Sequence, residues 1–458
     1  MPTESDSDAA YQLNDLGNSL ADRREFDAAI DAYRQAILLL PNFAAAHSNL
    51  GAALRDAGRV GEALAAHKRA VELNPRSPAA LNNLGVALND AGWFADAIKV
   101  FGAATAFDPN YAEAWTNLGV AYLSNRDSAR AIEAGRRATE IDPKLAKARM
   151  NYAMILLATG NLHEGFVEHE WRFACHPDFK PRQLDRPFWD GRAMPDGTLL
   201  IHAEQGFGDT IHFVRYVRRA MELSNRVVME VHPELARLMS DMAGNVVARG
   251  EPLPAFDAHC SMMSVPAILN LDAHDPSVYI TPRPKLVAIW ADRLRQYHRP
   301  RVGICYRGRP THSNDQNRSM PADTLRELVR RDDVSWVSLL KPKTASSPSP
   351  GVPEEGKGDA RFGVDFSEEL NDFADTAALI ANLDLVIAVD TAVAHLAAAM
   401  GKPCWIMLPY VAEWRWMIDG DRSPWYPSVR LFRQSRFADW TDVVSQVSAA
   451  LDEFNEAR

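Results

Sequence analysis

The sequence contains little cysteine. Only four of its 458 residues are cysteines, and no two of them form a C-x-x-C pair; they are Cys175, Cys260, Cys305 and Cys404. Widely spaced single cysteines indicate neither a disulfide framework nor a structural zinc site. We expect most of them to be small buried hydrophobic side chains.

Long hydrophobic runs are also missing. The most apolar stretch, residues 383–409, is interrupted by Asp390, His395 and Lys402, whereas a membrane-spanning helix needs about 20 predominantly apolar residues. The first residues, MPTESDSDAA, are acidic and polar and do not have the basic and then apolar pattern of a secretory signal. We therefore expect a cytoplasmic protein without a membrane span.

Basic residues are outnumbered by acidic ones. The chain has 50 Lys and Arg against 60 Asp and Glu, a formal net charge of -10. This balance disfavours partners that are held mainly through a phosphate backbone or anionic lipid, so no nucleic acid is expected, but it leaves room for a local basic pocket. With 47% apolar and 24% charged residues, the composition is that of a globular protein, and the length suggests about three domains.

A period of 34 residues organises the first third of the chain. The prolines with this spacing are Pro41, Pro75, Pro109, Pro143 and Pro177. A Leu-Gly pair recurs in the same register at residues 16–17, 50–51, 84–85 and 118–119, with Tyr152-Ala153 as a degenerate fifth copy. Small residues let antiparallel helices approach closely, and each proline ends a helix pair. Residues 9–178 therefore resemble five tetratricopeptide (TPR) repeats that stack into a curved α-solenoid with a concave groove.

One polar position keeps the same period. Asparagine stands immediately before the Leu-Gly position in four copies, at Asn49, Asn83, Asn117 and Asn151. An amide both donates and accepts hydrogen bonds, so such a ladder is suited to bind the backbone of an extended protein acceptor in the groove. The alternative is that these asparagines are ordinary solvated positions of the repeat, and the residues by themselves favour neither interpretation.

After a connector at residues 179–198, short apolar runs alternate with segments of helical periodicity. This alternation favours parallel sheets covered by helices, and we expect two lobes, residues 199–297 and residues 298–458 with a terminal helix. Ligands of such sheets bind at the carboxyl ends of the strands. The turns after the strands are therefore where we expect the chemistry.

Two strand-to-helix turns contain candidate site residues. In the first, Gly206 and Gly208 allow a ligand to approach the backbone, and Asp209 opens the next helix, either as a cap or as a functional carboxylate. The second turn leads into a helix whose first amides are suited to hold a phosphate oxygen. Its candidate residues are Asp390, Thr391, Ala392, Val393 and His395, although Asp390 also suits a cap and His395 a packed side chain.

A third turn, residues 306–319, concentrates hydrogen-bond donors in one loop. Its arginines, hydroxyls and amides favour a bound anion, most simply a diphosphate, over a solvated loop. The candidate donor-binding residues in this turn are Tyr306, Arg307, Gly308, Arg309, Asn314, Arg318 and Ser319.

Several segments resemble bacterial TPR-containing glycosyltransferases related to the heptosyltransferases. They are EQGFGDTIHFVRYV, HSNDQNRSMP, DFADTAALIANLDLVIAVDTAVAHLAAAMGKPCW, EWRW and SPWYPSVRLFRQ. The resemblance implies a GT-B glycosyltransferase module of two Rossmann-like lobes after the TPR solenoid, with the nucleotide sugar mainly on the second lobe. It also implies that Asp209 is the general base, that Arg318 and the turn from Asp390 to His395 hold the donor diphosphate, and that the transfer is inverting.

The resemblance extends to the repeats and shows one clear departure. In glycosyltransferases of the O-GlcNAc type, an asparagine ladder of TPR repeats contacts the acceptor protein, which favours the functional interpretation of the ladder here.

Heptosyltransferase relatives usually have Trp, a small residue, Gly and Asn where this chain has Tyr306, Arg307, Gly308 and Arg309. The two additional arginines bear on which nucleotide sugar is accepted.

The sequence thus predicts a glycosyltransferase that moves a sugar from a nucleotide-sugar donor to a hydroxyl group, on a protein presented by the TPR groove. We expect neither a metal nor a cofactor. Asp419-Gly420-Asp421 matches a metal-binding Asp-x-Asp motif formally, but it does not follow a clear strand and is more typical of a solvated turn. Two alternatives stay open: a TPR scaffold that binds a nucleotide sugar without turning it over, and a glycosyltransferase that acts on a saccharide.

Overall fold

A computed structural model of the chain describes residues 3–175, 181–242, 245–309, 314–340 and 362–457. Pro177, residues 179–180 of the predicted connector and residues 310–313 of the arginine-rich turn lie outside the described residues. The chain divides into two compact units, Met1–Thr159 and Gly160–Arg458. The domain limits given by the sequence stay predictions.

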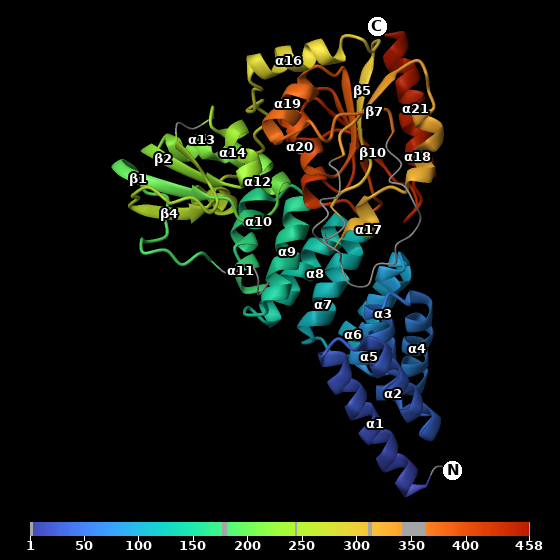
Figure 1. Cartoon of the computed structure of the whole chain (residues 1–458). Coiled ribbons are helices and arrows are strands. Elements are labelled where there is room, and N and C mark those ends of the chain that lie inside the picture. Colours follow the sequence, from blue (N-terminus) through green and yellow to red (C-terminus); the bar gives the residue numbers. More distant parts are fainter. Residues whose placement is uncertain (1–2, 176–180, 243–244, 310–313, 341–361, 458) are drawn as a thin grey trace. The chain divides into compact units, whose positions relative to one another are not determined.

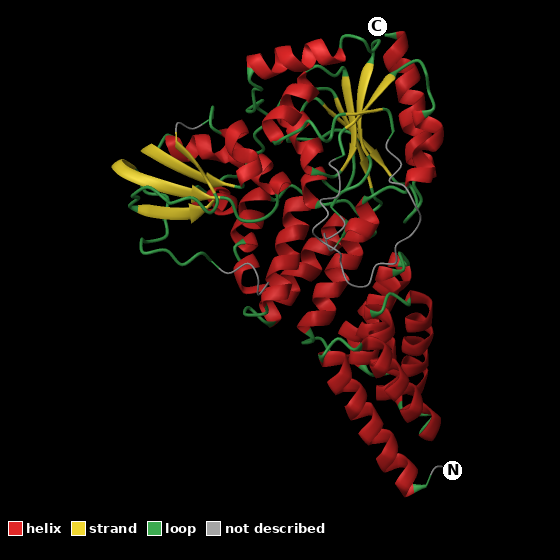
Figure 2. Cartoon of the chain, viewed as in Figure 1, coloured by secondary structure: helices red, strands yellow, loops and turns green. Residues whose placement is uncertain are grey.

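The first unit consists of helices joined by short turns (Figures 1 and 2). They are α1 (Glu4–Asp22), α2 (Phe26–Leu39), α3 (Ala44–Asp56), α4 (Val60–Leu73), α5 (Pro78–Asp90), α6 (Phe94–Phe107), α7 (Ala112–Ser124), α8 (Ser128–Ile141) and α9 (Ala146–Ala158). From α1 to α8 each pair spans one period of the sequence, and α9 begins the next, so the predicted helical repeats are confirmed.

The glycines of the Leu-Gly pairs allow the two helices of a repeat to approach closely. A Cβ atom at Gly17 would lie 2.4 Å from the ring of Tyr33, and one at Gly85 would lie 2.5 Å from the ring of Phe101. At such distances the ring or the helix would have to shift to make room for a side chain. In the first and third repeats, an aromatic ring of the second helix therefore occupies the space that the glycine leaves on the first.

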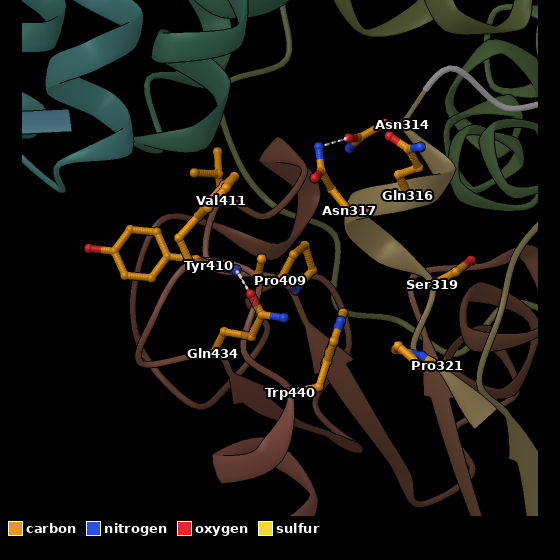
Figure 3. A pocket seen from close by; sticks show the side chains of 12 residues that line it. Asn314, Gln316, Asn317, Ser319, Pro321, Pro409, Tyr410, Val411, Gln434 and Trp440 are labelled. Atoms are coloured by element: carbon orange, nitrogen blue, oxygen red, sulfur yellow. Dashed lines mark hydrogen bonds between the residues drawn. The ribbon is translucent and has the colours of Figure 1, made fainter. Parts of the chain in front are cut away.

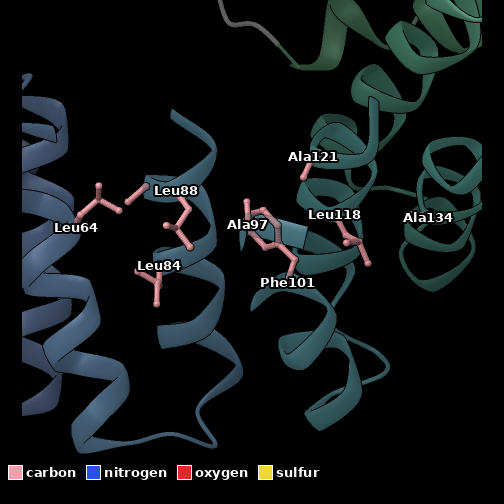
Figure 4. Close-up of a cluster of buried hydrophobic side chains, with 9 residues drawn as sticks. Leu64, Leu84, Leu88, Ala97, Phe101, Leu118, Ala121 and Ala134 are labelled. Atoms are coloured by element: carbon pink, nitrogen blue, oxygen red, sulfur yellow. The ribbon is translucent and has the colours of Figure 1, made fainter. Parts of the chain in front are cut away.

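A hydrophobic cluster in this unit extends over several repeats (Figure 4). Its buried side chains are Leu64, Leu84, Ala87, Leu88, Ala97, Phe101, Leu118, Ala121 and Ala134. They come from α4 to α8, so each repeat shares its apolar face with the next. This continuity is what stabilises a stack of helix pairs that have no separate cores.

The second unit contains two parallel sheets (Figure 2). The first has the strand order β3-β2-β1-β4, and the second has the order β10-β9-β8-β5-β6-β7. The strands are β1 (Met194–His202), β2 (Ser224–Val231), β3 (Asn245–Ala248), β4 (Ala258–Ser261), β5 (Arg301–Cys305), β6 (Ser335–Ser338), β7 (Val364–Asp365), β8 (Leu385–Val389), β9 (Cys404–Leu408) and β10 (Val429–Arg433). The predicted α/β region of parallel sheets is therefore confirmed.

Helices of the second unit follow the strands and cover the sheets. They are α10 (Leu162–His169), α11 (Arg172–Cys175), α12 (Phe207–Phe213), α13 (Val217–Met221), α14 (Pro233–Met239), α15 (Val265–Ile268), α16 (Pro284–Leu294), α17 (Asp315–Arg318), α18 (Ala322–Val329), α19 (Phe373–Ala381), α20 (Ala392–Ala399) and α21 (Thr441–Glu456), with 3-10 turns η1 (Val214–Tyr216), η2 (Met262–Ser264) and η3 (Trp414–Trp416). The central strands β8 and β9 are buried along their whole length, as expected for a parallel sheet covered on both faces.

Three further sequence expectations concern single residues and helices. Cys260, Cys305 and Cys404 are buried and unpaired, whereas Cys175 is half-buried. Within the described ranges, no helix is long and apolar enough to cross a membrane. Asp419 and Asp421 are exposed in the segment before β10, and no cluster of three or more acidic, His or Cys side chains in the described part of the chain is arranged to hold a metal ion.

Candidate functional site

Two of the predicted turns meet between the sheets of the second unit. Gly208, at the start of α12, lies against the start of α20: a Cβ atom at position 208 would be 3.2 Å from Cδ2 of His395 and 3.7 Å from Cα of Ala392. Each turn follows the carboxyl end of a strand, β1 in one sheet and β8 in the other. The tertiary structure thus joins residues that are almost two hundred positions apart.

The start of α20 has no side-chain cap. Thr391 occupies the N-cap position, but its hydroxyl donates to the carbonyl oxygen of Val389 at 3.2 Å instead of accepting from the helix. The first N–H groups of a helix have no intrahelical acceptor and carry a partial positive charge. The amides of Ala392, Val393 and Ala394 are therefore suited to hold an anion.

The arginine-rich turn places Arg318 in the same neighbourhood. Ser319 accepts a hydrogen bond from the N–H of Gly308 at 2.9 Å and donates one to Asp315 at 2.8 Å, which folds the turn back on itself. The Arg318 side chain is 15% exposed and lies 3.5 Å from Asp315. The pKa of Asp390 is lowered: burial raises it, but the contact with His395 and the more distant charge of Arg318 outweigh burial.

The other residues of that turn point to different places. Arg309 is exposed and lies over the ring of Phe207 at 5.5 Å, next to the glycine turn of the first sheet. Arg307 lies over the buried ring of Tyr306 at 5.8 Å. Asn314 is exposed before α17 and accepts from Asn317 at 2.8 Å. Arg318 lies close enough for its charge to lower the pKa of Asp390.

Both carboxylate oxygens of Asp209 are engaged. Oδ2 accepts from the N–H of Gly206 at 3.0 Å, a capping interaction, and Oδ1 accepts from Nη2 of Arg415 at 2.6 Å. Arg415 also donates from Nη1 to Glu413 at 2.5 Å. The sequence prediction missed Arg415 and Glu413, although the signal was present: both follow β9, at the carboxyl edge where ligands of parallel sheets bind.

His395 is packed inside the second unit. It is 4% exposed, with Nε2 3.6 Å from Oδ1 of Asp390 and Nδ1 3.0 Å from the hydroxyl of Tyr426, while Trp416 stacks on its ring. The pKa of His395 is lowered, chiefly by burial. The His395 side chain packs against the turn that begins at Asp390. Its predicted contact with the donor stays a prediction.

A cavity of about 220 Å³ lies at the carboxyl edge of the second sheet (Figure 3). Its lining residues follow β5, β9 and β10; they are Asn314, Gln316, Asn317, Ser319, Pro321, Pro409, Tyr410, Val411, Gln434, Phe437, Ala438 and Trp440. Only Asn314 and Ser319 were predicted. Gln434 is 1% exposed and is held by a hydrogen bond from the N–H of Tyr410 at 3.0 Å, which gives this wall a fixed shape.

The asparagine ladder in the first unit connects successive repeats. Asn49 donates to Asn14 at 3.0 Å, Asn83 donates to Ser48 at 3.0 Å and Asn117 donates to Asn82 at 2.9 Å, each time to a residue 35 positions earlier. All three are half-buried, as is Asn151. The ladder therefore has a structural role that neither sequence interpretation included, and these bonds use only the amide N–H groups.

Comparisons with known proteins agree with the predicted resemblance. Residues 14–78, 53–111 and 83–146 match the tetratricopeptide repeat family, and residues 370–406, from α19 into β9, match glycosyltransferase family 9 (heptosyltransferase). The chain is 27% identical over 329 residues to protein FlbA of Caulobacter vibrioides, an alignment that covers 66% of this chain and 54% of FlbA. The chain thus spans about half the length of that relative.

Two of the solved structures similar to this chain are those of MamA and of a TPR protein. MamA is 26% identical, covering 35% of this chain and 94% of MamA, with a TM-score of 0.31. A thermophilic TPR protein of Thermus thermophilus is 23% identical, covering 37% of this chain and 92% of its own, with a TM-score of 0.34. The family matches thus combine TPR repeats with a short segment that is similar to glycosyltransferase family 9, and the GT-B assignment stays a prediction.

Proposed function

We propose that this chain is a GT-B glycosyltransferase that moves a sugar from a nucleotide-sugar donor to a hydroxyl acceptor. The observation that carries the proposal is the meeting of three predicted turns: the one with Asp209, the one with Arg318 and the uncapped start of α20. The family 9 match falls on the third of these turns. A carboxylate beside an anion site is suited to sugar transfer from a nucleotide, because the carboxylate can accept the acceptor proton and the anion site can stabilise the departing diphosphate.

The donor diphosphate lies at the start of α20, beside Arg318. Helix amides and a guanidinium group both stabilise phosphate oxygens, and they do so most strongly where negative charge develops on the departing nucleoside diphosphate. Arg318 is largely buried and held by Asp315, so it is already positioned for this task. In this proposal no metal is needed, because the helix start and Arg318 supply the positive charge.

The cavity beside Ser319 accommodates one ring of the same donor. Its volume of about 220 Å³ is below the roughly 300–1,000 Å³ of typical small-molecule sites, so it has room for part of a nucleotide sugar. Tyr410 and Trp440 contribute aromatic surface and Asn317 a polar side chain (Figure 3). This mixture suits a planar or sugar ring with polar substituents.

Asp209 takes the proton of the acceptor hydroxyl. As that oxygen forms its bond to the anomeric carbon of the donor sugar, the bond from this carbon to the diphosphate oxygen breaks, and the nucleoside diphosphate leaves. Attack from the side opposite to the leaving group inverts the configuration. General-base assistance of this kind typically contributes about 10²- to 10⁴-fold.

A protein acceptor is presented by the TPR repeats. The N–H groups of Asn49, Asn83 and Asn117 hold the preceding repeat, which directs each amide and leaves its oxygen as an acceptor for the backbone of an extended peptide. Such contacts select main chain and not a particular sequence.

One observation favours the alternative of a scaffold that binds a nucleotide sugar without turnover. Both oxygens of Asp209 already have partners, which is typical of a structural carboxylate. Turnover separates the two functions, because only an enzyme releases nucleoside diphosphate from its donor. If the transferred sugar is found on a saccharide and not on a protein, the chain is a saccharide-directed glycosyltransferase.

The first experiment is a thermal-shift panel of UDP-, GDP-, ADP- and CMP-sugars. A ligand at 100 times its Kd adds about 2.7 kcal/mol to the stability of the folded state. The donor that shifts the transition should lose most of its effect in Arg318→Ala and keep it in Arg326→Ala, an exposed arginine of α18 that pairs with Asp323. If no nucleotide sugar shifts the wild type, the proposed function is wrong.

A further inference from the structure

Two carboxylates share the guanidinium group of Arg415. Its Nη2 donates to Oδ1 of Asp209 at 2.6 Å and its Nη1 donates to Oε1 of Glu413 at 2.5 Å. The other oxygen of each carboxylate is held by a backbone N–H, that of Gly206 for Asp209 and that of Arg415 itself for Glu413, both at 3.0 Å. Both ends of the guanidinium group are therefore occupied, and both carboxylates have fixed positions.

Around Arg415, negatively charged side chains outnumber positively charged ones. Arg415 is 7% exposed, so water does little to screen it. Asp390 is a third carboxylate in electrostatic contact with Glu413 and Arg415. The histidines nearest to Arg415 are His169, His212 and His395, and burial lowers the pKa of all three, so they are neutral near pH 7. Arg415 therefore faces three carboxylates, and of these the charge of Arg318 reaches Asp390. Negative charge is in excess, an arrangement in which one carboxylate is easily protonated.

Glu413 is the member of the group that changes charge near neutral pH. Removal of its carboxyl from water raises the pKa of Glu413 to about 7; Arg415 opposes this shift, and the charges of Asp390 and Asp209 reinforce it. The carboxyl is removed from water although 31% of the side-chain surface is exposed.

We propose that Glu413 is a positioning residue for Asp209 and that Glu413 acts through Arg415, the arginine that the two carboxylates share. When Glu413 is ionised, it balances part of the charge of Arg415, and Oδ1 of Asp209 can exchange its contact with the arginine for the acceptor proton. When Glu413 is protonated, it no longer balances Arg415, so the guanidinium group holds Oδ1 of Asp209 more strongly and competes with the acceptor proton for that oxygen. This inference rests on the proposed function, since it assigns Asp209 a proton to take.

The proposal makes the transfer rate depend on pH in a specific way. The rate rises as the pH passes upward through the region near 7, because Glu413 becomes ionised there. Glu413→Gln resembles the protonated glutamate at every pH, so its transfer rate should not rise near pH 7. Above that pH it should be roughly tenfold slower than the wild type, because it loses part of the rate enhancement that the general base provides. Glu413→Asp keeps a titrating carboxyl and should restore a pH-dependent rate.

Turnover is measured as release of nucleoside diphosphate, with water as the acceptor, from the UDP-, GDP-, ADP- or CMP-sugar that gives the largest thermal shift. The matched control is Glu222→Gln, an exposed glutamate at the end of α13 that pairs with Arg219, and it should keep the wild-type profile. A Glu413→Gln variant that keeps both the wild-type rate and its rise with pH would overturn the inference and leave the proposed function intact. Absence of donor binding in the wild type would instead refute the proposed function.

Infrared spectroscopy gives a readout that does not depend on turnover. The wild type should show the carbonyl band of a protonated carboxylic acid that disappears as the pH rises past about 7, and Glu413→Gln should lack it. In Asp209→Asn the band should remain, with its midpoint at lower pH, because one of the neighbouring negative charges is gone. A wild type without this band, or an Asp209→Asn variant with an unchanged midpoint, would show that the two carboxylates are not coupled.

Discussion

The side chain of Arg318 lies over the backbone of Gly308. A Cβ atom at position 308 would be 2.6 Å from Nη2 of Arg318 and 2.8 Å from Oδ1 of Asp315. The N–H of Gly308 donates to Ser319, which itself donates to Asp315, so glycine, arginine and aspartate form one closed turn. The absence of a side chain at position 308 thus leaves the space in which the proposed diphosphate ligand, Arg318, is held.

Gly308→Ala should weaken donor binding almost as much as Arg318→Ala. The added methyl group displaces the ends of two side chains but no backbone, so the melting temperature should change little. Loss of one charge-assisted hydrogen bond of about 1.5–3 kcal/mol corresponds to roughly 10- to 100-fold in Kd, measurable by calorimetry. The control is Gly102→Ala, where nothing lies within 4 Å of the new Cβ atom. If Gly308→Ala binds the donor as tightly as the wild type, the position of Arg318 does not depend on the glycine.

Asp209→Asn should reduce transfer by about 10²-fold or more and leave donor affinity nearly unchanged. The amide keeps one oxygen for either Arg415 or Gly206, but it cannot accept a proton. Turnover and binding of the same nucleotide sugar are compared in wild type and variant. If Asp209→Asn transfers sugar at the normal rate, Asp209 is not the general base, and its role is limited to the capping interaction and the ion pair.

The asparagine ladder requires a test that separates peptide binding from repeat packing. Changing Asn49, Asn83 and Asn117 to Ala removes the bonds between repeats together with the proposed peptide contacts, each worth about 0.5–1.5 kcal/mol. The matched control is Ser48→Ala with Asn82→Ala, which removes two of the same inter-repeat bonds but keeps all three ladder asparagines.

We expect the triple variant to lose capture of the protein acceptor and the control to keep it, while donor hydrolysis continues in both. Alanine is a better helix former than asparagine, which offsets part of the lost packing. Equal loss of acceptor capture in the two variants would mean that the asparagines act by holding the repeats together.

Arg24→Gly should stabilise the first unit by about 0.5–1 kcal/mol. Residues 24 and 126 have positive φ, 61° each, at the turn where Gly58, Gly92 and Gly160 occupy the same place in other repeats. A left-handed conformation costs a residue with a side chain roughly 1–2 kcal/mol, more than the added flexibility of glycine in the unfolded chain. Arg55→Gly, in the right-handed α3, should instead destabilise the unit. Urea unfolding of both variants provides the comparison.

The stability contributed by Glu413 should fall as the pH rises. Its pKa in the folded chain, about 7, lies above its ordinary value of 4.5, so between these values the folded chain binds a proton that the unfolded chain has released. The unfolding free energy of the wild type, relative to Glu413→Gln, should therefore decrease from about pH 4.5 to about pH 7 and level off above. A difference that is constant or rises over this range would contradict the raised pKa.

Much of the architecture was predictable, because its signals are local. The 34-residue period follows from contacts such as Gly17 against Tyr33 and Gly85 against Phe101, which lie within single repeats. Alternating apolar runs and helical segments gave the parallel sheets, and the rule that ligands bind at carboxyl ends of strands pointed to Asp209, Arg318 and Asp390. The cavity lined by Tyr410, Gln434 and Trp440 was missed, because its walls follow three different strands.

The sequence by itself determined the elements of this protein and their order, since repeat spacing, hydrophobic periodicity and glycine positions are properties of neighbouring residues. Only the tertiary structure decided which charges meet. Arg415 and Asp209 are 206 positions apart, and they form an ion pair because α12 and η3 come together at the carboxyl edges of two different sheets. No local pattern encodes that contact: the charge of a buried carboxylate depends on groups brought to it through space, and their distances are set by packing.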